Sequence, residues 1–308
     1  RDDSGHLISS TSELVLAGYA KNHEIVRKLL QHREYATRLK MFGPEYLKWV
    51  HPITGRIHGQ LFPFTGAGRY AMRAPNLLQL PRDKAYRKCF SAKPGRKLVI
   101  ADYSQVELRG MAQLSKDAAL ISAYKEGRDV HKQTAEVVTG VKLDTVSKER
   151  AKELRQLAKA VNFGLIYSLG AAKFVLYAQA SYGVTVTQKE AERIIEKYFQ
   201  TYKGVKAWQE SVFKHVKPTG VTYTALGRRR YLDPRMNHGS FLNTPDQGSC
   251  ADGLKITLPL LMNVLDTKYA GRAEFVLAVH DEIILEADDD PELLRELLHD
   301  LEQCMVAG

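Results

Sequence analysis

The sequence contains only three cysteines, Cys89, Cys250 and Cys304, among its 308 residues. They lie far apart and are odd in number, so they predict neither a disulfide framework nor a zinc site built from cysteine pairs. Sparse cysteine also favours a reducing compartment. The sequence has no apolar run near the roughly 20 residues that cross a bilayer, and its start lacks the pattern of a secretion signal. We therefore expect a globular protein with no membrane partner.

The sequence also lacks a Walker-type phosphate loop, an internal repeat and a low-complexity linker. Any nucleotide phosphates would then have to be held by separate Lys and Arg side chains. The formal net charge is +10, and it is unevenly spread. Residues 275–308 hold ten acidic and one basic residue, so this part carries −9 and residues 1–274 carry +19. A basic body of this size suits a polyanion, although solvated lysine-rich faces would give the same count.

An apolar run of strand-forming residues, Leu98 to Ala101, ends abruptly in the carboxylate of Asp102. Ser104 then opens a helical pattern with Glu107 three residues later, which is the spacing of a capping box. The stretch predicts a strand, a sharp turn and a helix. A carboxylate at the end of a buried strand is held on rigid backbone, where a hard divalent cation can reach it. An ordinary helix cap in a mixed α and β domain would explain the same residues.

A second group of carboxylates is expected at the tip of a hairpin. Residues 274–286 predict two strands about a tight turn that contains His280, Asp281 and Glu282. Two divalent ions about 3.5 to 4 Å apart need negative ligands that bridge them, and such a tip beside another strand ending in a carboxylate would supply these ligands. A surface turn is the alternative explanation of the same three residues.

Residues 148–169 predict a long helix with an unusual ridge. Arg155, Lys159, Phe163 and Tyr167 recur at every fourth position, so they follow one another along one face of a helix. Two cations followed by two aromatic rings could neutralise a triphosphate and stack on a base. A solvated basic end followed by core aromatics would give the same spacing.

The first part of the chain predicts a helix over residues 12–49 that is interrupted at Gly43-Pro44. Residues 51–81 are rich in Gly, Pro, Arg and Asn and cannot form a regular helix. The glycines of this segment allow close backbone approach, and its arginines could contact phosphate and sugar. A flexible surface loop would have the same composition. Further on, residues 227–231 form a dense basic turn, and residues 243–255 predict a helix that starts after Pro245.

In this order, these stretches resemble the polymerase motifs of the family A DNA polymerases, the DNA polymerase I group. The resemblance covers nearly the whole chain from about Ser10 and is somewhat phage-like. Residues 102–109 resemble the first palm motif, 155–167 the fingers helix, 279–283 the second palm motif, 65–81 the primer-side motif, 127–131 a fingers element near the triphosphate, and 227–231 with 243–247 the template and primer contacts.

The resemblance implies a helix-rich α+β fold of the right-hand type, with an antiparallel palm sheet, helical fingers and a partial thumb. The expected divisions are a partial thumb over 1–46, the first part of the palm over 47–110, fingers over 111–226 and the second part of the palm over 227–308. This leaves no room for a proofreading domain.

The implied activity is template-directed DNA synthesis, in replication or repair, with dNTPs added to a primer 3′ end by a two-metal-ion mechanism. The implied cofactors are two Mg²⁺ ions, for which Mn²⁺ can substitute. The implied partners are primer-template DNA and dNTPs, and we expect a monomer. The expected location is the cytoplasm of a bacterial or phage-infected cell, with an organelle as the alternative.

The family's functional residues carry over onto matching positions of this sequence. Lys159 would contact the triphosphate and also protonate the leaving group, and Glu107 would reject ribonucleotides. The catalytic residues would be Asp102, Asp281 and Lys159, and the metal ligands Asp102, Asp281, Glu282 and the backbone of Tyr103. The nucleotide-binding residues would be Arg155, Lys159, Phe163, Tyr167, His131, Glu107 and Gln105. The DNA contacts would be Arg69, Asn76, Gln79, Arg87, Arg229, Asn243, Gln247 and His280.

Two other functions stay open at this point. A single-subunit RNA polymerase is disfavoured by Glu107, because a carboxylate there would crowd a 2′ hydroxyl. A DNA-binding fragment without activity is disfavoured because both metal carboxylates, Asp102 and Asp281, are present. One departure from the family pattern is Ser168, which stands where glycine is expected and could stiffen the end of the fingers helix.

Overall fold

A computed structural model describes residues 10–308 apart from 21, 64, 82, 232 and 234–237. The chain divides into two compact units, each assembled from separate parts of the sequence. The first unit contains the described residues of Arg1–Leu47, Met111–Thr219 and Asp233–Leu242, and the second those of Lys48–Gly110, Gly220–Leu232 and Asn243–Gly308. The predicted helix-rich α+β class with an antiparallel sheet is confirmed. Among the described residues, no helix is long and apolar enough to cross a membrane.

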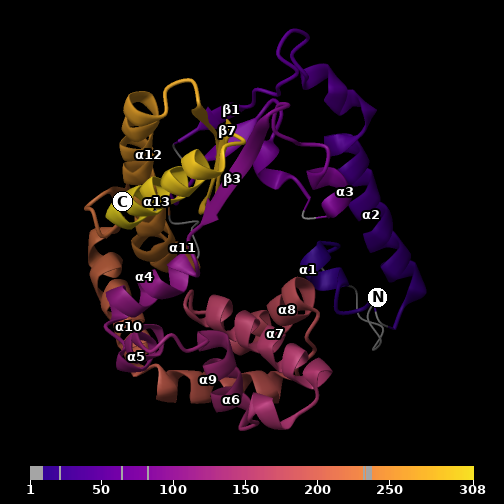
Figure 1. Cartoon of the computed structure of the whole chain (residues 1–308). Coiled ribbons are helices and arrows are strands. Elements are labelled where there is room, and N and C mark those ends of the chain that lie inside the picture. Colours follow the sequence, from indigo (N-terminus) through magenta and orange to yellow (C-terminus); the bar gives the residue numbers. More distant parts are fainter. Residues whose placement is uncertain (1–9, 21, 64, 82, 232, 234–237) are drawn as a thin grey trace. The chain divides into compact units, whose positions relative to one another are not determined.

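The second unit is built on a three-stranded antiparallel sheet in the order β3-β7-β6. Along β7, Ile283, Leu285 and Ala287 are buried at alternate positions, as expected for a strand with one face on a core. Helices α12 and α13 share this hydrophobic core with the sheet (Figure 1). The predicted strand before Asp102 and the predicted hairpin are therefore confirmed. The bounds are β3 Arg96–Asp102, β6 Ala273–Val279, β7 Glu282–Asp288, α12 Ser249–Lys268 and α13 Pro291–Ala307.

Two small antiparallel pairs complete the β structure of this unit, β1 with β2 and β4 with β5. Between residues 51 and 81 the described chain forms only short strands and one 3₁₀ turn, which confirms the prediction of no regular helix there. The bounds are β1 Gln60–Phe62, β2 Ala71–Arg73, η2 Leu77–Gln79, α3 Lys84–Arg87, β4 Val221–Tyr223 and β5 Arg229–Tyr231, while η1 Pro44–Trp49 runs from the first unit into this one.

The first unit is helical in its described part. Helix α7 starts at Lys148 because Ser147 caps it, accepting a hydrogen bond from the backbone N–H of Arg150. It ends at Leu165, four residues earlier than predicted. The bounds are α1 Glu13–Leu16, α2 Glu24–Phe42, α5 Ala118–Lys125, α6 Val130–Thr139, η3 Leu143–Thr145, α7 Lys148–Leu165, α8 Ala171–Tyr182, α9 Gln188–Thr201 and α10 Lys203–Thr219. Two helices, α4 Val106–Ser115 and α11 His238–Asn243, run from one unit into the other.

Two predicted helix boundaries are wrong. The predicted helix over residues 12–49 is interrupted not only at Gly43 but also between α1 and α2, where Gly18 and Asn22 favour a turn. No residue of α2 is buried, so no core packing of α2 opposes the break between α1 and α2. The helix expected after Pro245 starts earlier, because α11 reaches Asn243 and a π-helix, η4 (Thr244–Gly248), joins it to α12.

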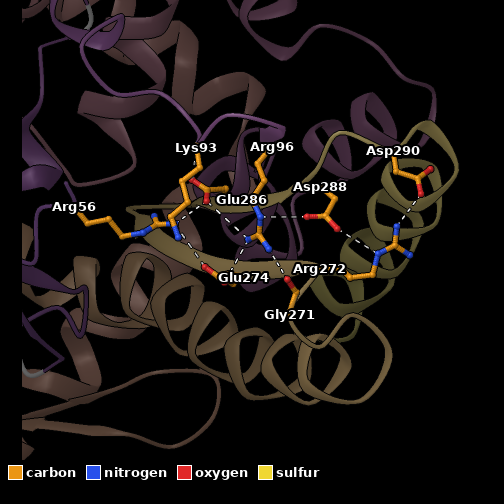
Figure 2. A network of polar contacts seen from close by, with 9 residues as sticks. All are labelled: Arg56, Lys93, Arg96, Gly271, Arg272, Glu274, Glu286, Asp288 and Asp290. Carbon is orange, nitrogen blue, oxygen red and sulfur yellow. Dashed lines mark hydrogen bonds and ion pairs between the residues drawn. The ribbon is translucent and has the colours of Figure 1, made fainter. Parts of the chain in front are cut away.

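The end of the sheet away from the β6–β7 turn is held by a network of ion pairs (Figure 2). Glu286 is only 2% exposed and lies directly opposite Glu274 on the neighbouring strand. Arg56 Nη2 donates to Glu286 Oε1 at 2.6 Å and lies 3.6 Å from Glu274 Oε2. Arg96 Nη1 lies 3.3 Å from Glu274 Oε1 and 3.9 Å from Glu286 Oε1. Two carboxylates that would repel each other across the strands therefore share two guanidinium groups.

Candidate active site

Three predicted metal-binding carboxylates meet at the other end of this sheet. Asp102 is the last residue of β3 and pairs in register with Glu282, the first residue of β7. Asp281 precedes Glu282 in the turn, and its carbonyl oxygen accepts a hydrogen bond from the backbone N–H of Tyr103 at 3.2 Å. His280 forms the turn with φ 59, and Gln105 has φ 54 just after the strand β3. Both are strained conformations for residues other than glycine, and such strain is concentrated at functional sites.

The carboxylates at this end repel one another. Burial raises the pKa of Asp102, and the negative charges of Asp281 and Glu282 raise it further. None of the three forms an ion pair with a described residue. A divalent cation would relieve this repulsion, and carboxylate oxygens are the ligands that Mg²⁺ prefers.

No group of three or more His, Cys, Asp or Glu side chains in the described part of the chain is arranged to hold a metal ion by itself. At phosphate-handling sites, Mg²⁺ is commonly bound by one or two carboxylates together with water and substrate phosphates. The carboxylates of Asp102, Asp281 and Glu282, which lie close enough to affect one another's charge, are donors of that kind.

Glu107 lies in a cluster with two other predicted site residues. Its Oε1 accepts hydrogen bonds from Arg69 Nη2 and, at 3.3 Å, from Gln247 Nε2. Helix α4 begins at Val106, and Gln105 before it has a positive φ, so Ser104 and Glu107 do not occupy the first and last positions of a capping box. Segments 38 and 140 residues away from Glu107 therefore determine its position.

The glycine-rich turn at residues 65–69 is approached by arginine side chains of this chain. Arg228 Nε pairs with Asp252 Oδ1 at 2.7 Å, and its Nη2 donates to the carbonyl oxygens of Ala67 and Gly248. A Cβ at Gly68 would lie 2.2 Å from Arg228 Nη2, so no larger residue is accommodated while Arg228 stays in place. Arg228 thus ties the turn that precedes Arg69 to the start of α12.

In the first unit, the predicted ridge lies on α7. Arg155 pairs through Nε and Nη2 with Asp129 Oδ2, both at 3.0 Å, and Asp129 Oδ1 caps α6. Lys159 forms no ion pair with a described residue. Phe163 lies beside His131, with ring centroids 5.9 Å apart. Tyr167 lies after the last residue of α7. The ridge on the helix therefore contains Arg155, Lys159 and Phe163, but not Tyr167.

His131 is buried at the start of α6. Burial lowers its pKa to about 4, and the positive charges of Arg155 and Lys159 act in the same direction against the opposing charge of Asp129. The imidazole is therefore neutral near pH 7.

The sequence model of DNA polymerase family A matches residues 3–307. The chain belongs to DNA polymerase family A. The thermostable DNA polymerase I of Thermus thermophilus is 36% identical over 293 residues, covering 90% of this chain and 34% of that protein. DNA polymerase I of Aquifex aeolicus is 36% identical over 296 residues, covering 94% of this chain and 49% of that protein.

A solved structure supports the same assignment to family A. It is the POL domain of Pol1 from M. smegmatis, in complex with DNA primer-template and dNTP, and it is similar to this chain with a TM-score of 0.82 at 32% identity. The likeness covers 99% of this chain and 54% of that one. The predicted family is therefore confirmed, and the chain spans about a third of the length of the Thermus relative.

The DNA contacts predicted from the family A resemblance all lie in the second unit. Arg87, Arg229, Gln79 and His280 are exposed. Asn76 has a structural partner, because its Oδ1 accepts a hydrogen bond from Leu78 N at 3.1 Å and caps η2. Asn243 Oδ1 is a buried atom with no hydrogen-bond partner in the described chain, so a bound group could satisfy it. Their roles toward DNA stay predictions.

Sequence reasoning missed two residues that support predicted site residues, one in each unit. Asn162 contacts His131, and Arg228 holds the turn before Arg69, yet neither was selected. A signal existed for each. Asn162 is a polar residue on the otherwise apolar side of α7, and Arg228 stands in the basic run that had been noticed as a group.

Proposed function

We propose that this chain is the polymerase domain of a DNA polymerase I type enzyme, and that it adds dNTPs to the 3′ end of a DNA primer as a template directs. The main support is the meeting of Asp102, Asp281 and Glu282 at one end of the sheet in a family A chain. The DNA primer-template and dNTP bound to the similar M. smegmatis domain support both partners.

In this proposal the thumb is residues 1–46, the palm 47–110 and 227–308, and the fingers 111–226. Residues 1–9 and 21 of the thumb lie outside the described residues. The monomeric state and the cytoplasmic location stay predictions.

Asp102, Asp281 and Glu282, with the backbone carbonyl of Tyr103, would hold two Mg²⁺ ions, or Mn²⁺ in their place. When bound, such ions activate the primer hydroxyl and stabilise the charge on the departing pyrophosphate. The protein's own part is to hold Asp102 and Glu282 at the ends of β3 and β7, with Asp281 in the adjoining turn, so that no reorganisation is needed when charge develops.

The side chains of α7 would bind the incoming nucleotide. Lys159, a cation without an ion-pair partner in the described chain, is available to a phosphate and to protonate the leaving pyrophosphate. Arg155 would exchange its pairing with Asp129 for a phosphate contact. The ring of Phe163 would lie against the sugar and base, and that of Tyr167 against the template base.

Glu107 would select against ribonucleotides. Arg69 and Gln247 both donate to its carboxylate, so it is held in one position. A held side chain excludes a 2′ hydroxyl better than a mobile one, because moving it would break two hydrogen bonds. Gln105 would contact the same nucleotide.

Primer-template DNA would be held mainly through its phosphates by the basic residues of the second unit. We assign contacts to Arg69, Asn76, Gln79, Arg87, Arg229, Asn243, Gln247 and His280. Because phosphate binding releases counterions, DNA affinity should fall steeply as salt is raised.

A primer-extension assay tests the proposed function. The wild-type chain with Mg²⁺ or Mn²⁺ should extend a primer with dNTPs and extend it poorly with NTPs. Absence of extension with either ion, while the chain is folded, would overturn the proposal.

The same assay tests the role of Glu107. Glu107→Ala should accept NTPs much better than the wild type, while Glu107→Gln, of matched size, should retain more of the selectivity. If Glu107→Ala keeps the wild-type preference for dNTPs, Glu107 is a structural residue only.

A further inference from the structure

A chain of buried hydrogen bonds connects three helices of the first unit and ends on His131. Asn162 Nδ2 lies 3.0 Å from His131 Nδ1, and Thr134 Oγ1 donates to Asn162 Oδ1 at 3.0 Å. Thr134 Oγ1 also lies 2.9 Å from the hydroxyl of Tyr202, at the end of α9. Asn162, Thr134 and Tyr202 are 0% exposed and His131 is 4% exposed. Buried polar chains of this kind stay intact because each broken bond leaves an unsatisfied group.

The direction of these hydrogen bonds follows from what each group can do. Asn162 receives a hydrogen bond at Oδ1, so its amide nitrogen is the atom that faces His131, and an amide nitrogen can only donate. Nδ1 of His131 must therefore accept. A neutral imidazole with Nδ1 as acceptor has its proton on Nε2, which makes Nε2–H a donor.

The other end of the chain continues in the same direction. A hydroxyl has one proton, and Thr134 Oγ1 donates its proton to Asn162 Oδ1. Thr134 Oγ1 must therefore accept from the hydroxyl of Tyr202. This arrangement gives the buried Tyr202 O–H an acceptor.

The surroundings of His131 also keep the ring neutral. Burial and the nearby cations Arg155 and Lys159 disfavour a protonated ring, while only Asp129 favours it. Positive charge for a polyphosphate is already supplied by Arg155 and Lys159. What the imidazole can add at this place is a directed neutral donor.

We propose that Asn162 is a positioning residue that holds His131 in the Nε2–H form, so that the ring presents a hydrogen-bond donor to the triphosphate of the incoming nucleotide. The proposal rests on the proposed function, because it deepens the binding of dNTP. Thr134 and Tyr202 act through Asn162 by orienting its amide. Asn162 itself touches neither the nucleotide nor the reacting atoms.

The first test needs no substrate. In the free protein with ¹⁵N-labelled histidine, two-bond and three-bond ¹H–¹⁵N correlations distinguish a bare Nδ1 from a bare Nε2. The wild type should show bare Nδ1 and protonated Nε2 at pH 7. Asn162→Asp should reverse the pattern or protonate the ring, because a carboxylate accepts from Nδ1–H. Thr134→Val, which removes one hydroxyl at nearly constant volume, should give a mixture of the two forms.

The second test uses the polymerase assay. Asn162→Leu should raise the dNTP KM about tenfold, the effect of losing one hydrogen bond to a charged group, with kcat nearly unchanged. Binding that is equal in the ground and transition states changes KM alone. Damage to packing would instead lower kcat and the melting temperature. In a His131→Gln background, which lacks the imidazole, the Asn162→Leu change should have much less effect on KM.

The two tests separate the failure of this proposal from failure of the proposed function. A wild-type ring with protonated Nδ1, or protonated on both nitrogens at pH 7, overturns the proposal even if the enzyme extends primers. Asn162→Leu with the wild-type tautomer and the wild-type KM also overturns it. A folded chain that extends no primer overturns the proposed function, while the tautomer measurement still decides what Asn162 does to His131.

Discussion

The two ends of the β3-β7-β6 sheet can be compared directly, because both place several carboxylates on the same strands. At the hairpin tip, Asp102, Asp281 and Glu282 repel one another and form no ion pair with a described residue. At the opposite end, the carboxylates are shared among arginines in the network of Figure 2. Stability alone would favour pairing at both ends. The unpaired end is therefore where the fold gives up stability, as the cation-binding site of the proposed function would require.

The largest effect should come from removing charge at the unpaired end. Asp102→Asn takes away one of the proposed metal ligands, and several kcal/mol of transition-state stabilisation correspond to a fall in primer extension of about a thousandfold. Stability without metal should stay the same or rise, because a repulsive charge has gone. Extension rates and denaturant unfolding in EDTA would check both halves. A fully active variant, or one that is markedly less stable, would contradict the assignment of function to the unpaired end and of stability to the paired end.

At the paired end, we expect a large loss of stability without a loss of activity. Arg56→Met leaves the buried Glu286 with the more distant Arg96 and the backbone N–H of Lys93, and should lower the free energy of unfolding by about 1 to 3 kcal/mol. The activity per folded molecule should not change. Arg295→Met on the exposed side of α13 is the matched control and should have almost no effect. Equal stability of the two variants in urea would show that the network is unimportant.

The pH dependence of stability should sharpen the contrast. The pKa of Asp102 lies above its ordinary value of 3.8, for which burial is the first cause and its acidic neighbours the second. A raised folded-state pKa stabilises the protein fully below pH 3.8, and this contribution is lost as pH rises through the folded pKa. Asp102→Asn should therefore gain stability relative to the wild type as pH rises. If the stability of Asp102→Asn relative to the wild type instead increases as the pH falls, the pKa of Asp102 is not raised in the folded protein and the explanation is wrong.

The smallest effect is expected at the rim of the paired end. Lys97 and Asp289 form an ion pair at 2.6 Å, but their side chains are 58% and 44% exposed. Such pairs contribute about 0 to 1 kcal/mol. Lys97→Ala should therefore change the midpoint of urea unfolding far less than Arg56→Met does. If the two changes are equal, burial does not determine the strength of these pairs.

Local features of the sequence predicted the unpaired end well. The apolar run before Asp102 and the two apolar runs on either side of the turn that contains Asp281 are short-range patterns, so the strand, the turn and the meeting of the carboxylates followed from them. The long helix α7 followed from its own spacing and cap in the same way.

The rest depends on partners that are distant in the sequence. Arg56 and Glu286 are 230 residues apart, and no local pattern pairs them. Glu107 fitted a capping box by spacing alone, whereas the structure surrounds it with Arg69 and Gln247. Glycine was expected at position 168, and the structure shows the reason. Ser168 has a positive φ, a conformation that glycine adopts most easily, at the point where the chain leaves α7.

The most direct test of this division uses one substitution at both ends of the same strand pair. Asp281→Asn and Asp288→Asn each convert an aspartate to its uncharged amide, the first at the unpaired tip and the second within the network beside Arg96 and Arg272. Primer extension and urea unfolding would be measured on both. We expect Asp281→Asn to lose extension without losing stability, and Asp288→Asn to lose stability while retaining extension. Substantial extension by Asp281→Asn, or equal loss of extension in both variants, would contradict the account.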